Sequence, residues 1–132
     1  MSKISVLMSV YKKENPEYLR ASLESILVQT RTADEILLIE DGPLTQELYQ
    51  VVAEYQKKCD YLHVHAMEQN VQLGRALAKG VELCQYDLIA RMDTDDIAMP
   101  DRLEKEEAYM EAHPEVDVVG GAIREFNDEG TI

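Results

Sequence analysis

Short apolar runs alternate along this chain with segments whose apolar residues recur at helical spacing. The run Ile4–Val10 is mostly apolar, as expected for a strand buried on both faces of a sheet, and Glu35–Glu40 repeats that pattern. Between them, apolar side chains recur every three or four residues over Pro16–Val28, which predicts an amphipathic helix. Strands and helices that alternate through short links form a mainly parallel sheet. We therefore predict an α/β fold with helices flanking the sheet.

The rest of the chain continues the alternation. Asn15 followed by Pro16 is typical of a helix N-cap and its first helical position, and Asn70–Gly74 is predicted to be a loop. Asn127–Gly130 is a turn signal before a returning strand at Thr131–Ile132, so we expect the chain to stop before its fold is complete. The other predicted elements are a helix with Leu44, Leu48, Val51, Val52 and Tyr55 facing inward, a strand at Leu62–Ala66, a helix lined by Ala76, Leu77, Val81 and Cys84, a strand at Leu88–Met92, a helix from Pro100 to His113–Pro114, and strands at Val116–Val119 and Ala122–Phe126.

Length and charge narrow the class of protein. The 132 residues predict one domain, residues 1–132, with no internal repeat or linker. The net charge of −13 argues against a nucleic-acid partner, because phosphate backbones require clustered Lys and Arg. No apolar run approaches the roughly 20 residues of a transmembrane helix. Cys59 and Cys84 lack metal-type spacing, and we expect reduced thiols in a cytoplasmic protein.

Three carboxylates, those of Asp93, Asp95 and Asp96, follow the predicted strand Leu88–Met92. Open α/β sheets bind ligands at the carboxyl ends of their strands. Crowded carboxylates repel one another unless a cation offsets their charge, and Mg²⁺ and Mn²⁺ prefer oxygen donors. The cluster therefore predicts a divalent-metal site for a phosphorylated ligand. A merely solvated acidic loop is the alternative, which the helix start at Ile97–Pro100 disfavours.

The Asp cluster belongs to an ordered set of short motifs. The others are Ser5–Tyr11, Tyr18–Arg20 through Ser25–Thr30, Glu35–Gly42, Asn70–Gly80, Ile89–Arg91, Pro100–Leu103 and His113–Val116. In this order and spacing the chain resembles the family 2 glycosyltransferases, which have the GT-A (Rossmann-like) nucleotide-sugar-binding fold. The resemblance covers almost the whole chain, and the form of Arg91–Ile97 is similar to bacterial enzymes of capsule, exopolysaccharide or lipopolysaccharide biosynthesis.

The resemblance implies which residues bind the nucleotide, expected to be UDP-linked. It places Ser9 and Tyr11 at the base and ribose, Asp41 at the uracil ring, and Arg75 beside the nucleotide. From the residues alone, Asp41 can also be the N-terminal cap of the helix at Leu44 or a turn-forming residue. Glu40 stands where the family usually has Asp.

The resemblance also implies the metal ligands. The family's Asp-x-Asp (DXD) motif falls on Asp93–Thr94–Asp95, with Asp95 as the direct ligand of Mn²⁺ or Mg²⁺, Asp93 near the ribose or a metal-bound water, and Asp96 as a further ligand. The family's general base comes from the acceptor-binding half, which would lie beyond residue 132. The resemblance therefore implies an inverting glycosyltransferase whose present segment binds the donor but does not transfer sugar.

We expect a nucleotide-sugar and a glycan or lipid-linked glycan as partners, with the full-length protein peripheral at the inner membrane. We also expect self-association through apolar surface around Val118, Val119 and Ile123. The alternatives are a non-catalytic metal–nucleotide binding module and, less favoured, a sugar-phosphate nucleotidyltransferase, whose Gly-rich loop is missing after the first strand. His63 and His65 share one strand face but have no third zinc ligand in view.

Overall fold

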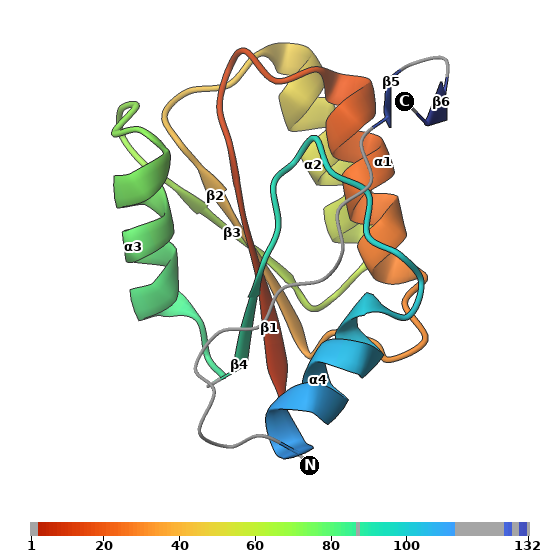
Figure 1. Cartoon of the computed structure of the whole chain (residues 1–132). Helices are drawn as coiled ribbons and strands as arrows, with labels where there is room; N and C mark the ends of the chain where they lie inside the picture. The colour runs from red at the N-terminus through yellow and green to blue at the C-terminus, as the bar shows by residue number, and fades with distance from the viewer. Residues whose placement is uncertain (1–2, 87, 113–125, 128–129, 132) are drawn as a thin grey trace.

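The computed structural model describes residues 3–86, 88–112, 126–127 and 130–131. Helices cover both faces of a four-stranded parallel sheet, which confirms the predicted α/β class (Figure 1). In chain order the elements are β1 (Ile4–Val10), α1 (Pro16–Leu27), β2 (Glu35–Glu40), α2 (Gln46–Lys58), β3 (Leu62–Ala66), α3 (Leu73–Leu83), β4 (Leu88–Arg91), α4 (Arg102–Ala112), β5 (Phe126–Asn127) and β6 (Gly130–Thr131).

The strand order β3-β2-β1-β4 determines where a ligand can bind. The chain runs outward from β1 through β2 to β3, and then returns to place β4 on the other side of β1. Val10 pairs with Glu40 at the end of β2, and Leu7 pairs with Arg91 at the end of β4. Such a reversal of strand order leaves a crevice at the carboxyl ends of the strands. The motifs that follow β1, β2 and β4 are thereby brought to one edge.

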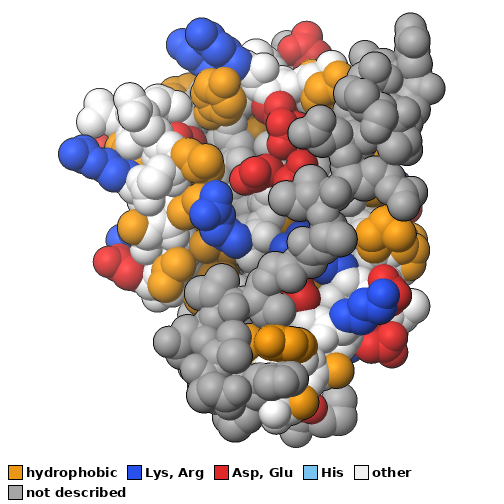
Figure 2. Space-filling view, viewed as in Figure 1, with side chains coloured by type: hydrophobic (Ala, Val, Ile, Leu, Met, Phe, Trp, Pro, Cys, Tyr) orange, Lys and Arg blue, Asp and Glu red, His pale blue; other side chains and the backbone are white. Residues whose placement is uncertain are grey.

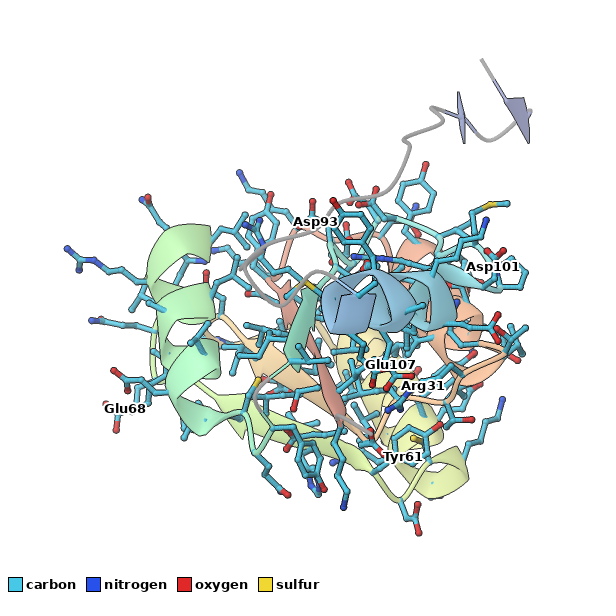
Figure 3. All side chains as sticks on the ribbon, turned by 60° about the horizontal axis from the view of Figure 1, so that its bottom comes forward. Arg31, Tyr61, Glu68, Asp93, Asp101 and Glu107 are labelled. Atoms are coloured by element: carbon cyan, nitrogen blue, oxygen red, sulfur yellow. The ribbon has the colours of Figure 1, made fainter. Side chains whose placement is uncertain are left out.

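The two sheet faces pack against different helices. The larger core cluster lies on the face covered by α1 and α2, and it includes Leu103 of α4; the smaller cluster joins β1 and β2 to α3 (Figure 1). Gly80 permits the close approach of α3, because a Cβ there would lie 2.3 Å from Leu7 Cδ1. An ion-paired Arg31 fixes α4 to the loop after α1, with Nη2 2.8 Å from Glu107 Oε2 and Nη1 2.9 Å from Asp34 Oδ2 (Figure 3).

The N-cap predicted for the first helix is confirmed, whereas the second helix has a different N-cap from the one considered. Asn15 is the N-cap of α1, as predicted, and its side chain accepts a hydrogen bond from the Glu17 N–H at 2.8 Å. The N-cap of α2 is Thr45, whose hydroxyl accepts from the Leu48 N–H at 3.3 Å. The alternative in which Asp41 caps this helix is therefore wrong.

Several boundaries differ from the prediction. Helix α3 begins at Leu73, inside the predicted loop, because backbone hydrogen bonding already starts at the Gln72 carbonyl. Strand β4 ends at Arg91, and α4 begins at Arg102 after a turn, so Pro100 precedes the helix. Phe126–Asn127 and Gly130–Thr131 form an antiparallel pair around the predicted turn.

Other predictions cannot be compared with the structure. The strand predicted at Val116–Val119 lies outside the described residues, as does the apolar surface around Val118, Val119 and Ile123.

Among the helices that the structure describes, none combines the length and apolar character that crossing a bilayer requires.

Candidate functional site

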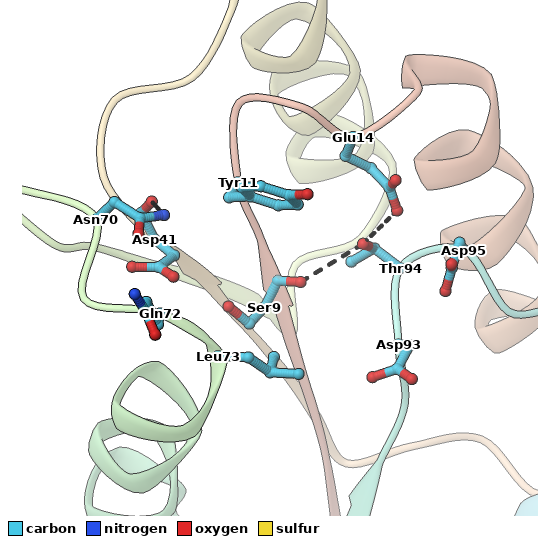
Figure 4. A pocket seen from close by; sticks show the side chains of 10 residues that line it. All are labelled: Ser9, Tyr11, Glu14, Asp41, Asn70, Gln72, Leu73, Asp93, Thr94 and Asp95. Atoms are coloured by element: carbon cyan, nitrogen blue, oxygen red, sulfur yellow. Dashed lines mark hydrogen bonds between the residues drawn. The ribbon is translucent and has the colours of Figure 1, made fainter.

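A pocket of about 590 Å³ opens at the carboxyl edge of the sheet, where β1, β2 and β4 end. Acidic side chains gather in the upper centre of this face of the molecule (Figure 2). Five of the predicted site residues line the pocket, together with five residues to which the sequence analysis assigned no role in the site. The lining residues are Ser9, Tyr11, Glu14, Asp41, Asn70, Gln72, Leu73, Asp93, Thr94 and Asp95 (Figure 4).

Ser9 and Tyr11 come from the end of β1 and the residue after it. Strand β1 lies between β2 and β4, so these two residues occupy the centre of the pocket edge. Tyr11 is 46% exposed, which leaves an aromatic side chain available to a planar ligand. Both residues therefore line the pocket, and their contact with a base and ribose stays a prediction.

Asp41, directly after β2, fixes the loop that precedes α3. Its Oδ1 accepts the Val71 N–H at 2.7 Å, and its backbone carbonyl accepts from the Asn70 side-chain amide at 3.2 Å. The residue is 4% exposed and lines the pocket. Within the described part of the chain Oδ2 has no hydrogen-bond partner, so it is available to a ligand donor. Asp41 thus positions the loop and also presents an acceptor to the pocket.

Gly42 makes the close contact between this turn and the loop possible. Its φ is +86°, and a Cβ at this position would lie 2.6 Å from the Asn70 nitrogen. Both conditions exclude other residues, because L side chains rarely adopt this φ and the neighbouring atom is backbone. The sequence signal Asp41–Gly42–Pro43 is therefore that of a turn which holds two walls of the pocket together.

Gln72 carries backbone strain at the other end of this loop. It has φ 73° and ψ 161°, and it is the one non-glycine residue with positive φ in the described chain. That conformation is populated almost only by glycine, so a glutamine there is strained. Nothing in the local sequence marks it, because Gln has no preference for such a conformation. Strain of this kind often accompanies functional sites.

The Asp cluster lies in the segment between β4 and α4. Asp93, Asp95 and Asp96 are exposed, and each offers a carboxylate oxygen within 4.8 Å of the others. Asp93 and Asp95 line the pocket, whereas Asp96 lies beside it. Partial burial, together with the negative charges of Asp93 and Asp95, raises the pKa of the Asp96 carboxyl, and the Arg102 guanidinium opposes that shift. The cationic groups near the cluster are the Arg91 guanidinium, 3.9 Å from Asp93 Oδ1, and the Arg102 guanidinium.

Thr94, the middle residue of the motif, fixes the two aspartates on either side. Its side chain is buried, and its hydroxyl donates to Glu14 Oε1 at 2.6 Å, with the Ser9 carbonyl at 3.5 Å as a second acceptor (Figure 4). Since Thr94 turns inward, its neighbours Asp93 and Asp95 face the pocket and solvent. Glu14 was not expected from the sequence, because its role depends on a residue far away in the chain.

Arg75, which was predicted to lie beside the nucleotide, and Glu40, which precedes Asp41, do not line the pocket. Arg75 is exposed on the first turn of α3 and does not line the pocket, so its nucleotide contact stays a prediction. Glu40, the last residue of β2, is 7% exposed, and burial raises the pKa of its carboxyl. It alternates with Ile36 and Leu38 and therefore faces the α1–α2 side of the sheet, away from Asp41.

The described residues are consistent with a divalent cation at the Asp cluster and not at the histidines. Three carboxylate oxygens at mutual distances within 4.8 Å form a hard donor set of the type that Mg²⁺ and Mn²⁺ prefer. His63 and His65 lie on β3, and no third ligand joins them among the described residues. A tetrahedral zinc site at β3 is therefore not supported.

The sheet order and the pocket define a parallel α/β domain whose pocket lies where the strand order reverses. Residues 5–132 match the sequence family described as Glycosyl transferase family 2, and the chain belongs to that family.

Several curated relatives align along nearly the whole chain. An uncharacterized glycosyltransferase of Haemophilus influenzae is 52% identical over 94% of this chain and 46% of its own length. The amylovoran biosynthesis glycosyltransferase AmsE of Erwinia amylovora is 47% identical, over 96% of this chain and 47% of its own. A UDP-Gal:alpha-D-GlcNAc-diphosphoundecaprenol beta-1,3-galactosyltransferase of Escherichia coli is 35% identical, over 98% and 48%. The chain therefore spans about half the length of the curated relatives it matches.

Solved structures confirm the GT-A fold. TarS 1-349 of S. aureus in complex with UDP-GlcNAc superposes with a TM-score of 0.74 at 23% identity, covering 85% of this chain and 32% of that one. The mannosyltransferase PcManGT of Pyrobaculum calidifontis, solved with GDP-Man and Mn²⁺, gives 0.73 at 14% identity, over 83% and 32%. At these identities the similarity establishes the fold and does not transfer a substrate.

Proposed function

We propose that this chain is the donor-binding part of an inverting glycosyltransferase, and that its pocket takes a UDP-linked sugar together with Mg²⁺ or Mn²⁺. One observation carries the proposal: the pocket joins Ser9, Tyr11 and Asp41 on one side to Asp93 and Asp95 on the other. A flat aromatic surface and a hydrogen-bond acceptor fit a nucleoside, and clustered carboxylates fit the cation that a diphosphate requires. The names of relatives and of neighbouring structures that bind UDP-sugars support the same choice.

Each side of the pocket has its own task in this proposal. Tyr11 packs against the base or ribose, Ser9 contacts the nucleoside, and Asp41 Oδ2 accepts a hydrogen bond from the uracil ring. Asp95 would hold the cation directly, with Asp93 and Asp96 as the neighbouring ligands. When bound, a divalent cation supplies Lewis-acid stabilisation of the charge that grows on the diphosphate leaving group. Arg75 keeps its proposed place beside the nucleotide.

The acceptor side completes the reaction. Inversion requires a general base within hydrogen-bond reach of the attacking hydroxyl, and the proposal assigns that base to residues beyond position 132. The acceptor would be a glycan or a lipid-linked glycan in bacterial polysaccharide biosynthesis, as the names of two relatives indicate for those proteins. We place the protein in the cytoplasm, peripheral to the inner membrane.

Isothermal titration calorimetry with UDP tests the proposal directly. The chain should bind UDP with Mn²⁺ or Mg²⁺ and lose most of that affinity in excess chelator, because the cation bridges the diphosphate to the carboxylates. UDP at about 100 times its dissociation constant should add roughly 2.7 kcal/mol to the free energy of unfolding. Glu111→Ala, at an exposed acidic position on α4, is the matched control for changes at the Asp cluster. Equal binding with and without chelator would refute the metal-bridged pocket.

A further inference from the structure

The segment that carries the Asp cluster has almost no secondary structure of its own. Between the end of β4 at Arg91 and the start of α4 at Arg102 it forms only turns, with the Asp96 N–H donating to the Asp93 carbonyl at 3.1 Å. Its Met92, Thr94 and Ala98 side chains are buried, while the aspartates face outward. We call residues 92–101 the Asp loop. Something other than a helix or strand ladder must satisfy its backbone and hold its shape.

One polar stripe of α1 supplies those partners. Ser22 and Ser25 are spaced by three residues, and the Gln29 side chain continues the same line just past the end of the helix. The Ser22 hydroxyl donates to the Asp93 carbonyl at 3.2 Å, and the Ser25 hydroxyl accepts the Ala98 N–H at 3.0 Å. Two serines thus fix the loop on both sides of its carboxylates.

Gln29 fixes the far end of the Asp loop. Its amide nitrogen donates to the Met99 carbonyl at 2.6 Å, and its amide oxygen accepts the Leu103 N–H at 3.0 Å. The Thr30 N–H adds a hydrogen bond to the Pro100 carbonyl at 2.8 Å. The loop is therefore connected to α1 at the backbone of residues 93, 98, 99 and 100, and α4 is connected at its first turn.

The polar side chains of this stripe, Ser22, Ser25 and Gln29, are buried. Ser22, Ser25 and Gln29 are 0%, 6% and 6% exposed. The two serines share α1 with the buried Leu19, Leu23 and Ile26, and Gln29 lies just past its end. Polar groups in such a position are costly unless they are hydrogen-bonded, and apolar side chains would pack there without that requirement. Each of the three side chains has a backbone partner in the Asp loop, and their remaining hydrogen bonds go to the Ser22 and Ser25 carbonyls and to the Leu103 N–H. The polar stripe therefore supports that loop.

We propose that Ser22, Ser25 and Gln29 are positioning residues that hold the carboxylates of Asp93, Asp95 and Asp96 in a metal-binding arrangement before a cation arrives. The inference rests on the proposed function. Three like charges within 4.8 Å repel one another and would spread an unsupported loop apart. With its backbone held by α1, the loop keeps its ligands together, so binding a cation does not have to order it.

The test measures binding of Mn²⁺ and of uridine separately, on the same folded chain. Mn²⁺ alone is followed by electron paramagnetic resonance, and uridine, which has no phosphate, by NMR chemical-shift titration. Ser25→Ala should weaken Mn²⁺ about 10-fold, a typical effect of removing a group that orients metal ligands. Uridine affinity should change less than about twofold, because among the described residues no hydrogen bond joins Ser9, Tyr11 or Asp41 to the stripe. Ser25→Thr, which keeps the hydroxyl, should recover Mn²⁺ affinity.

Two further variants make the result decisive. Ser22→Ala removes a single bond to the Asp93 carbonyl and serves if Ser25→Ala fails to fold. Tyr55→Phe is the matched control, because it deletes a hydroxyl that joins α2 to Glu24 of α1 without touching the Asp loop. Mn²⁺ affinity unchanged in both serine variants, or Mn²⁺ and uridine affinities lowered equally, would overturn the positioning role. A parent chain that binds uridine and no Mn²⁺ would overturn the metal site itself, and this inference with it.

Discussion

Replacing Gln72 by glycine should stabilise the chain, although glycine normally destabilises. The observed φ of 73° and ψ of 161° lie in a region that costs a non-glycine residue about 1–3 kcal/mol. Against this gain stands the greater entropy of glycine in the unfolded chain, roughly 0.5–1 kcal/mol. The net expectation is about 1 kcal/mol of added stability, which corresponds to a rise in Tm of about 3–5 °C for a domain of this size.

Urea denaturation followed by circular dichroism measures this difference, with Gln72→Ala as the control. Alanine removes the side chain beyond Cβ but keeps the Cβ that makes this φ strained, so it should give no gain. Gln72 lines the pocket, so UDP affinity is measured separately. If Gln72→Gly proves about 0.5–1 kcal/mol less stable than the parent, glycine has its ordinary cost and the strain argument is refuted.

Three other substitutions test the site and its surroundings. Asp95→Ala should abolish metal-dependent UDP binding and leave the fold intact or slightly more stable, because it relieves repulsion among the carboxylates; calorimetry showing parent-like binding of UDP with Mn²⁺ would exclude Asp95 as the ligand. Asp41→Asn should weaken uridine nucleotides selectively, by about 1.5–3 kcal/mol, because the amide keeps an acceptor for the Val71 N–H but can present a donor to the ring; an equal loss for cytidine nucleotides would assign Asp41 to loop support alone. Glu40→Gln should stabilise the chain near neutral pH. Burial raises the pKa of the Glu40 carboxyl, so the parent is favoured below the unfolded-state pKa and loses stability as pH rises through the folded-state value. Urea midpoints from about pH 4 to pH 8 should fall less in the variant, and parallel profiles would contradict a buried charge at position 40.

The strands and their order of appearance were predictable because their causes are local. Ile4–Val10 and Glu35–Glu40 are apolar enough to be recognised from composition, and Asn15–Pro16 carries its helix start in two adjacent residues. The position of Asp41 at the same pocket as Asp93 and Asp95 was also predictable, because parallel strands end at a common edge of the sheet. These predictions depend on the sequence within a few residues, or on a general rule of sheet topology.

The contacts that shape the pocket were not predictable, because they join distant residues. Thr94 meets Glu14, and Asp41 meets Val71, only after the sheet has formed. The strain at Gln72 is likewise imposed by its surroundings, against the preference of the residue. Ser22 and Ser25 carry no local signal that distinguishes them from other helix positions. Their hydrogen bonds to the Asp loop form only when that loop packs against α1.

The position of β4 beside β1 has a consequence for the time course of folding. Residues 4–7 pair with residues 88–91, whereas β1, β2 and β3 are joined by successive short crossovers. Bringing β4 to β1 closes the longer stretch of chain and costs more entropy, so β4 should dock late, after β1, β2 and β3 have assembled. The two halves of the pocket would then meet only near the end of folding. A ligand that spans both halves should consequently slow unfolding while leaving the refolding rate almost unchanged.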